Sequence, residues 1–340
     1  MRSRRVIPST AAAAAAAAVL AAALAVVPGA GARRAHAAAP ACTPVPNIEA
    51  IVDDSGSMAG TDPNRLRIAA LDLLIETPGN EGITFGAIEF GGAFLPGEVA
   101  TDTLFPPEPI GPNAKSMQAL LDEKVKADNG GTDYNAAFAK AKADDPGAKA
   151  WIFLTDGGHD IGEYENGHRG GPPTYVIGFS SAIAGPDGAR LQQIATETGG
   201  QYFPQTDSSN LQAVVNQIGA TLTCQTPPTT FKDAFAKLGQ SKTHAVSLAG
   251  KVRSAQLTLS WASPLDAFAI SNVKIVSHGK TVAVASRSHK LKVTTHQGST
   301  FLVVKLSSLV KGTLRFNVRA TKLGSGVAGV NLTSQVTQSR

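Results

Sequence analysis

The sequence lacks the short motifs that mark common hydrolases. It contains no G-x-S-x-G nucleophile motif and no H-E-x-x-H zinc motif. None of its seven histidines stands in a recognisable catalytic pattern. Its two cysteines are better explained by a disulfide than by a nucleophile. We therefore predict that the protein is not an enzyme and has no catalytic residues.

Long hydrophobic runs are absent beyond the start of the chain. The first 37 residues carry early arginines, an alanine-rich run over 11–27 and a small-x-small site at 35–37. This pattern predicts a secretory signal peptide over 1–37. The alternative is a membrane anchor, but the run is shorter than a ~20-residue span and mostly alanine. We expect a secreted, extracellular or cell-wall-associated protein whose mature chain has no membrane span.

Cysteine is scarce, and its two positions flank one half of the chain. Cys42 and Cys224 are the only cysteines among 340 residues. Secretion into an oxidising compartment favours a disulfide between them, whereas two buried free thiols are the alternative.

Acidic residues are nearly absent from the last third of the chain. Residues 38–225 contain 10 Lys and Arg against 24 Asp and Glu, whereas residues 226–340 contain 16 against 2. Such asymmetry predicts two domains with different partners. We expect domains over 38–225 and 242–340, joined by a linker over 226–241 that holds a Pro-Pro pair.

The two halves also differ in hydrophobic periodicity. Apolar strands alternate with amphipathic helices through the acidic half, which predicts an α/β fold with a doubly wound, mostly parallel, Rossmann-like sheet. We expect an edge strand over 97–105 that stops at two prolines, and a last helix over 208–222. A helical turn or two is expected over 229–238. Beyond 242 the apolar period is two, which predicts a smaller all-β, sandwich-like domain.

Oxygen-rich side chains gather in three segments of the acidic half. Asp53, Ser55 and Ser57 follow the first strand, Thr132 precedes a helix, and Asp156 ends the strand "AWIFLT". All lie at carboxyl ends of strands or in loops at that edge, where ligands of such sheets bind. Two carboxylates and three hydroxyls are hard oxygen donors suited to Mg²⁺. A capped turn without a ligand is the alternative for the first segment alone.

The stretches "IVDDSGSM", "GGTD" and "FLTDGG" occur in the order and spacing of a von Willebrand factor type A (vWFA) domain, which residues 44–222 resemble. The resemblance implies a complete metal-ion-dependent adhesion site (MIDAS) for Mg²⁺ or Mn²⁺. Ser55, Ser57 and Thr132 would be hydroxyl ligands, and Asp53 and Asp156 would bind directly or through water. The implied function is adhesion, in which the metal captures an Asp or Glu carboxylate of an extracellular protein partner. The alternatives are a metal-dependent hydrolase and a wall-associated structural protein.

Two weaker signals lie outside these motifs. The loop 157–171 gathers two histidines and three acids, but its spacing matches no zinc pattern, and we expect a solvated loop beside the partner site. The lysines of the basic domain either face solvent, attract an anionic cell-surface polymer, or dock onto the acidic domain. No aromatic stacking pattern supports specific nucleic-acid binding.

Overall fold

The computed structural model describes residues 43–77, 79–92, 101–127, 130–180, 184–205, 208–248, 252, 254–284, 292–307, 309–326 and 329–339. The predicted signal peptide and Cys42 lie outside these ranges. Within them, no helix is long and apolar enough to cross a membrane.

The acidic half alternates strands and helices as its periodicity predicts. Its strands are β1 (Asn47–Asp53), β2 (Thr84–Phe90), β3 (Thr101–Pro109), β4 (Ala150–Thr155), β5 (Thr174–Phe179) and β6 (Gln201–Gln205). Its helices are α1 (Met58–Thr61), α2 (Leu66–Glu76), α3 (Ile110–Lys124), α4 (Tyr134–Asp144), α5 (Gly185–Thr198), the 3₁₀ turn η2 (Ser208–Asn210) and α6 (Leu211–Leu222).

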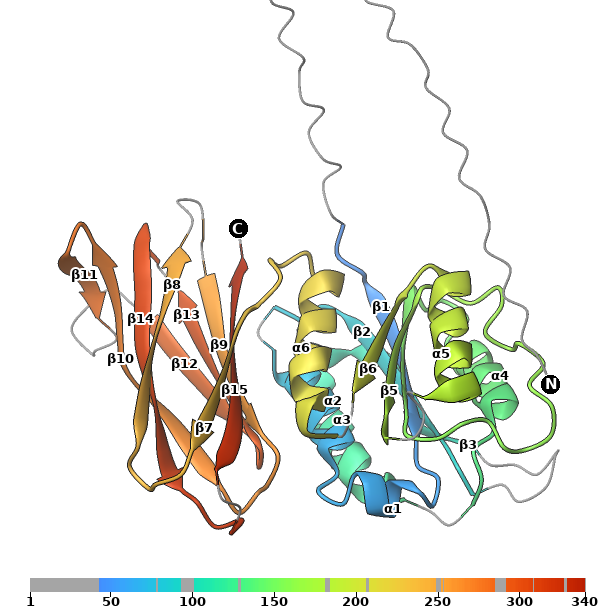
Figure 1. The fold of residues 1–340 in the computed structure, drawn as a ribbon. Helices are drawn as coiled ribbons and strands as arrows, with labels where there is room; N and C mark the ends of the chain where they lie inside the picture. The colour runs from blue at the N-terminus through green and yellow to red at the C-terminus, as the bar shows by residue number, and fades with distance from the viewer. Residues whose placement is uncertain are drawn as a thin grey trace, which may run out of the picture. The chain divides into compact units, whose positions relative to one another are not determined.

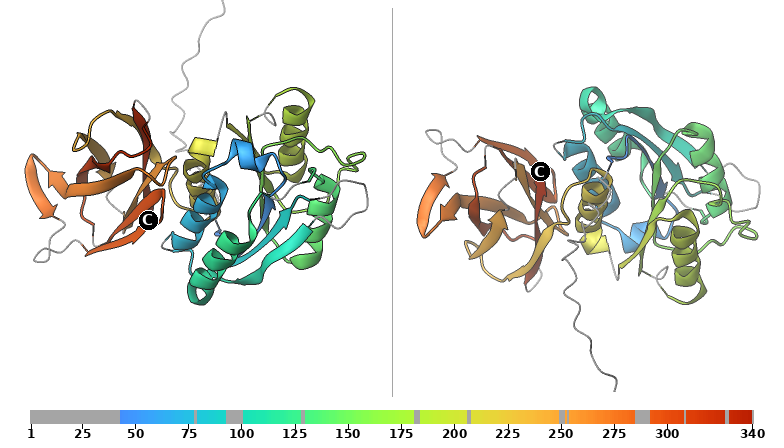
Figure 2. Two further views of the ribbon diagram at one scale, coloured as in Figure 1. Left: turned by 90° about the horizontal axis from the view of Figure 1, so that it is seen from below. Right: turned by 90° about the horizontal axis from the view of Figure 1, so that it is seen from above.

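The six strands form one twisted sheet in the order β3-β2-β1-β4-β5-β6. All neighbours are parallel except β2 and β3. Helices α2, α3 and α6 cover one face of the sheet, and α4 and α5 cover the other (Figures 1 and 2). The predicted doubly wound, mostly parallel α/β fold is therefore confirmed.

The strand order reverses at β1, because the chain moves from β1 to β2 on one side and later to β4 on the other. In open α/β sheets, ligands bind outside the carboxyl ends of strands at such a switch point. Helix α1 lies at this edge of the sheet (Figure 1). The fold therefore places the ends of β1 and β4 side by side where a ligand site is expected.

The predicted end of the edge strand was wrong, whereas the last helix covers its predicted residues but changes type near its start. Strand β3 continues through Pro106 and Pro107 to Pro109. Proline cannot donate a ladder hydrogen bond, but β3 pairs only with β2, and an edge strand tolerates that loss. The last helix begins as the 3₁₀ turn η2 before α6, and no side chain caps α6.

The basic half forms two antiparallel sheets. Its strands are β7 (Thr229–Phe235), β8 (Ser241–Leu248), β9 (Ser254–Trp261), β10 (Ala267–Ser277), β11 (Lys280–Val284), β12 (Lys292–Gln297), β13 (Phe301–Ser307), β14 (Gly312–Lys322) and β15 (Val330–Ser339). One sheet has the order β11-β10-β14-β8, and the other β12-β13-β9-β15-β7. Inward side chains of both sheets share one core, which confirms the predicted all-β domain.

The expected helical turn over 229–238 is wrong. Residues Thr229–Phe235 form β7, which pairs with β15, so much of the predicted linker belongs to the five-stranded sheet. Phe235 is fully buried in the core of the β domain. The domain boundaries stay a prediction, but a linker as long as 226–241 does not fit this pairing.

Helix α6 is buried on more than one side. Leu211, Val215 and Ile218 pack in the core beside the parallel sheet. On another side, Asn216 Nδ2 donates to Gln335 Oε1 of β15 at 2.8 Å, and Gln335 Nε2 donates to the backbone carbonyl of α6 residue Ala213 at 3.1 Å. Polar side chains thus join α6 to the five-stranded sheet.

Candidate metal centre

The first segment turns sharply after β1 and folds back on Asp53. This carboxylate is fully buried at the end of β1. Its Oδ1 accepts hydrogen bonds from Ser55 Oγ at 2.6 Å and from Ser55 N–H at 2.9 Å. Ser57 Oγ lies 3.2 Å from Ser55 Oγ. The D-x-S-x-S segment therefore holds its three oxygen-bearing side chains in one cluster, as expected.

The second and third segments reach the same place. Ser57 Oγ donates to Asp156 Oδ1 at 2.8 Å, although the two residues are 99 positions apart. A Cβ added to Gly157 would lie 3.5 Å from Thr132 Oγ1 and about 4.0 Å from Ser57 Oγ. Thr132 Oγ1 and Ser57 Oγ therefore both lie beside Gly157, the residue after Asp156. All five predicted residues converge at the sheet edge.

Four members of the cluster are buried, and one is exposed to solvent. Asp53, Ser55, Thr132 and Asp156 are all buried, whereas Ser57 is exposed. A ligand approaching from solvent therefore meets the cluster at Ser57.

Two threonines that sequence analysis missed complete the cluster. Thr155, the last residue of β4, donates from Oγ1 to Asp53 Oδ2 at 2.5 Å. Thr61, at the end of α1, donates to Asp156 Oδ2 and to the Ser57 carbonyl oxygen. Each carboxylate thus has a hydroxyl donor besides the predicted serines. The sequence could have pointed to Thr155 only through its position directly before Asp156.

A buried ion pair supports the loop below the cluster. Arg67 of α2 is fully buried and donates to Asp54 Oδ1 at 2.6 Å and to Asp62 Oδ2 at 3.1 Å. The Asp54 carboxylate also accepts the backbone N–H groups of Lys126 at 2.8 Å and Ala127 at 2.6 Å. Asp54 therefore ties the first motif both to α2 and to the segment that leads to Thr132.

Backbone contacts fix the loop that carries Thr132. The Thr132 N–H donates to Asp160 Oδ1 at 2.6 Å, and Gly56 N–H donates to the Gly130 carbonyl at 3.2 Å. Asp133 caps α4 by accepting the N–H groups of Asn135 and Ala136, as its position predicts. Asp160, from the loop after β4, is a further positioning residue that sequence analysis did not single out.

The electrostatics and donor set fit a divalent cation. Burial, and to a smaller extent the nearby Asp156 carboxylate, raise the pKa of Asp53 to about 6, against the lowering effect of hydrogen bonds from Ser55 and Thr155. No salt bridge in the described part of the chain involves Asp53. Nor do the described residues contain a group of three His, Cys, Asp or Glu side chains placed to hold a metal. Serine and threonine hydroxyls must therefore supply part of any coordination shell here.

The loop 157–171 is less solvated than expected. His168 is fully buried, with Nδ1 2.5 Å from Tyr164 Oη and Nε2 2.9 Å from Glu197 Oε2. His159 Nδ1 accepts the Tyr134 N–H at 3.1 Å. Burial lowers the pKa of both histidines. They brace the loop, while its acidic residues Asp160, Glu163 and Glu165 are exposed.

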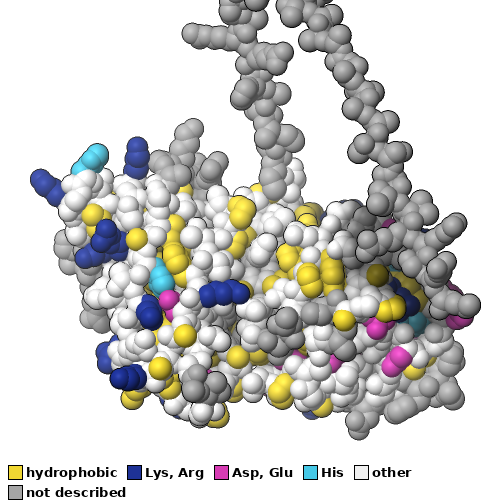
Figure 3. Space-filling view, viewed as in Figure 1, with side chains coloured by type: hydrophobic (Ala, Val, Ile, Leu, Met, Phe, Trp, Pro, Cys, Tyr) yellow, Lys and Arg dark blue, Asp and Glu magenta, His cyan; other side chains and the backbone are white. Residues whose placement is uncertain are grey.

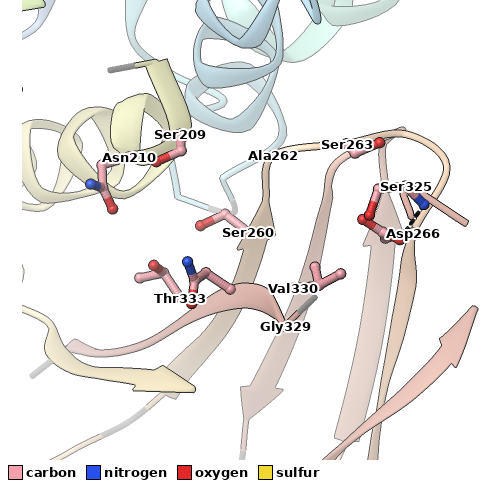
Figure 4. Close-up of a pocket in the computed structure, with 11 residues that line it drawn as sticks. Ser209, Asn210, Ser260, Ala262, Ser263, Asp266, Ser325, Gly329, Val330 and Thr333 are labelled. Atoms are coloured by element: carbon pink, nitrogen blue, oxygen red, sulfur yellow. Dashed lines mark hydrogen bonds between the residues drawn. The ribbon is translucent and has the colours of Figure 1, made fainter. Parts of the chain in front are cut away.

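A pocket of about 160 Å³ lies between η2 and the ends of the β strands (Figure 4). Its lining is mostly hydroxyl and amide groups, including Ser209 and Ser260. The one carboxylate in it, Asp266, accepts the backbone N–H groups of Gly324 at 2.9 Å and Ser325 at 3.1 Å. It contains none of the predicted site residues.

The described residues do not show whether the predicted disulfide between Cys42 and Cys224 forms. Cys224 is not a free thiol, but Cys42 lies outside them, so its pairing stays a prediction. Val45 N–H donates to the Leu222 carbonyl at 2.8 Å, which brings the start of β1 to the end of α6.

Comparisons with known proteins give distant likenesses. No protein-family model and no curated protein sequence matches the chain. Solved structures that match include a von Willebrand factor type A protein from Catenulispora acidiphila, with TM-score 0.41, 17% identity, and coverage of 87% of this chain and 64% of that one. Proximal thread matrix protein 1 from the mussel byssus, with a zinc-occupied MIDAS motif, matches with TM-score 0.43, 15% identity, and coverage of 56% and 50%.

The pilus adhesin SpaC from Lactobacillus rhamnosus GG matches with TM-score 0.40, 13% identity, and coverage of 86% of this chain and 44% of that one. The chain thus spans less than two thirds of each of these proteins. At such TM-scores the likenesses carry no argument about function, which depends on the geometry of the cluster.

Proposed function

We propose that the cluster at the ends of β1 and β4 is a metal-ion-dependent adhesion site of the vWFA type. Ser55, Ser57 and Thr132 would supply hydroxyl ligands to Mg²⁺ or Mn²⁺, and Asp53 and Asp156 would bind directly or through water. The observation that carries the proposal is the 2.8 Å contact between Ser57 and Asp156, which unites the first and third motifs. Hard oxygen donors of this kind suit both ions.

The metal would capture a carboxylate of an extracellular protein. Neutral hydroxyl ligands leave more positive charge on an ion than carboxylates do, so a further anionic ligand is favoured. Ser57 is the exposed member of the cluster, and it marks the side from which a partner's Asp or Glu can reach the ion. Secretion, which the leader over 1–37 predicts, places the site where such a partner is met.

Calorimetric titration of the purified chain with Mn²⁺ tests the metal site. We expect one site, lost in Asp53→Ala and in the double variant Ser55→Ala/Ser57→Ala. Asp122→Asn is the matched control, because it removes an exposed carboxylate of α3 and should leave Mn²⁺ binding unchanged. Wild-type affinity in the Asp53 variant would place the metal elsewhere.

Capture from the host's own surface extract tests the adhesion step. Partner protein should be retained in Mg²⁺, released by EDTA and absent with Asp53→Ala. Amidation of the carboxyl groups in the extract should abolish retention, because it removes the ligand that the ion binds. Retention that survives amidation would contradict carboxylate capture.

We further propose that the metal serves binding and not turnover. The alternative is a hydrolase that uses the ion to activate water, and Asp53-dependent turnover of a substrate by the purified chain would support it. The other alternative is a structural wall protein held by its basic domain. Release from the cell surface by high salt but not by EDTA would favour that role.

A further inference from the structure

A hollow on the outer face of the four-stranded sheet carries unneutralised positive charge. It is lined by Lys274 and Asn272 of β10, Arg315 and Asn317 of β14, and Thr243 of β8. None of the described residues that line it is an Asp or Glu. Figure 3 shows Lys and Arg side chains over the β domain, where few Asp or Glu side chains are visible.

The two cations stand directly opposite each other. Lys274 and Arg315 are register partners in the antiparallel pairing of β10 with β14. Neither has an ion-pair partner among the described residues. Like charges at facing positions of a sheet cost stability. An anion bound between them would remove that cost.

The acidic residues of this domain cannot supply the anion. The chain from 226 onward has only Asp233 and Asp266 as acids. Asp233 Oδ2 lies 2.7 Å from His244 Nε2, and Asp266 Oδ1 accepts two backbone N–H groups. Both carboxylates already have partners away from the hollow. An anion that neutralises Lys274 and Arg315 must therefore come from outside the domain.

Neutral donors surround the two cations. Thr243 Oγ1 donates to Asn317 Oδ1 at 3.0 Å, which leaves the Asn317 amide NH₂ as the group free to donate. The β10–β14 register shifts between Ser271 and Lys274, and Asn272 in this bulge has a positive φ of 52°. Bulges re-aim side chains, and asparagine tolerates this conformation. The bulge thus adds the Asn272 amide to the lining.

Donors on three strands fit a tetrahedral oxyanion. A planar carboxylate is satisfied by the bidentate fork of Arg315 alone. A phosphate group has oxygens pointing in several directions, and the arginine fork, the lysine ammonium of Lys274 and the amides can all reach it. The donor arrangement therefore favours phosphate over carboxylate.

The charge continues along β14 beyond the hollow. Lys311, directly before the strand, and Arg315 and Arg319 within it follow at intervals of four residues and are all exposed. A strand rises ~3.4 Å per residue, so Arg315 and Arg319 lie about 14 Å apart. A linear polymer with repeated phosphates could contact several of them at once. The outward residues of β8 and β14 are not aromatic, so the face offers no stacking platform for nucleic-acid bases.

We propose that the outer face of the β11-β10-β14-β8 sheet binds a linear phosphodiester polymer without bases, one phosphate of which occupies the hollow between Lys274 and Arg315. This site is independent of the metal centre and would hold the protein at a phosphate-bearing surface while the other domain binds its partner.

Fluorescence anisotropy with a labelled oligo(glycerol phosphate) tests the proposal on the purified chain in EDTA. Lys274→Gln/Arg315→Gln should weaken binding at least tenfold and flatten its salt dependence, because two phosphate contacts are lost. Lys232→Gln/Lys237→Gln is the matched control, since it removes two exposed lysines outside the hollow, and it should change affinity less than threefold. Melting temperatures no lower than that of the wild type would show that both variants fold.

Two comparator polymers decide the ligand class. Polyglutamate of equal charge should bind at least tenfold more weakly than the phosphodiester, and so should oligo(dT). Equal binding of polyglutamate would show that the face senses charge alone, and tighter binding of oligo(dT) would make it a nucleic-acid site. Equal effects of the two double variants would also overturn the proposal. These measurements are made in EDTA and do not depend on a bound metal. A negative result would therefore contradict the polymer site without bearing on the proposed metal site.

Discussion

Thr155 Oγ1 donates a hydrogen bond to Asp53 Oδ2 at 2.5 Å, and this contact joins the ends of β4 and β1 at the switch point of the sheet. The other oxygen of Asp53 accepts from Ser55. Asp53 is thus held on both sides before any ion binds. Groups that orient a metal ligand in this way commonly affect affinity as much as ligands do.

Replacing Thr155 by valine should therefore weaken Mn²⁺ binding by roughly 10- to 100-fold, the range typical of residues that orient ligands. The valine keeps the shape of the side chain, so the sheet should remain intact. Calorimetric titration measures the affinity, and circular dichroism checks the fold. Thr155→Ser restores the hydroxyl and should recover affinity. A valine variant with wild-type affinity would mean that Thr155 does not orient Asp53.

Two arginines near the start of α2 should differ sharply in their contribution to stability. Arg67 is fully buried between Asp54 and Asp62, so Arg67→Met leaves uncompensated buried charge and should cost about 3–5 kcal/mol. Arg65 is partly exposed; it pairs with the exposed Asp122 and donates to the Asp122 and Val125 carbonyls, so Arg65→Met should cost less, roughly 1–2 kcal/mol. Urea unfolding of the two variants gives the comparison. Equal losses would contradict the buried ion-pair role.

Glu49 should make the protein less stable at alkaline pH. Burial, and to a smaller extent the Asp145 and Asp144 carboxylates, raise the pKa of this carboxyl to about 9, while Lys140 acts to lower it. The pKa of Glu49 is near 4.5 in the unfolded chain and about 9 in the folded chain. At pH values between these two, Glu49 is deprotonated in the unfolded chain but keeps its proton in the folded chain. Stability is therefore fully present below pH 4.5 and falls as pH rises toward 9, by at most about 1.4 kcal/mol per pH unit.

The Glu49→Gln variant isolates this effect. It cannot ionise, so its free energy of unfolding should vary less between pH 5 and 9 and exceed that of the wild type at pH 8. Glu123→Gln on the exposed surface of α3 is the control and should keep the wild-type pH profile. If the free energy of unfolding changed with pH in the same way for the wild type and Glu49→Gln, Glu49 would not be the cause of the loss of stability at alkaline pH.

The convergence of the three oxygen-rich motifs could be predicted because parallel strands end at one edge, so motifs far apart in sequence had to meet there. The role of Arg67 could not, since a helix arginine looks like an ordinary surface residue until the packing is known, and for Thr155 the sequence offered only its position beside Asp156. The strand Thr229–Phe235 was missed because its apolar residues, Phe231 and Phe235, are four apart and fit a helix as well as a strand. Pairing with β15 decides between them.

A buried polar contact should stabilise the packing of α6 against β15. Gln335→Leu leaves the Asn216 amide and the Ala213 carbonyl without this partner, and should cost about 1–3 kcal/mol. Gln338→Leu, three residues further along the strand and more exposed, should cost less than about 1 kcal/mol. A double-mutant cycle with Asn216→Ala measures the coupling. Additive losses would show that the two side chains do not depend on each other.

The predicted disulfide between Cys42 and Cys224 should also contribute to stability. The hydrogen bond between Val45 and Leu222 brings the two flanking segments together, and Cys224 is not a free thiol. Such a bond would close a loop of about 180 residues, for which chain entropy predicts about 5 kcal/mol. Non-reducing peptide mapping should find the two cysteines linked, and Cys42→Ser/Cys224→Ser should unfold at lower urea. Two alkylatable thiols in the native secreted protein would refute the bond.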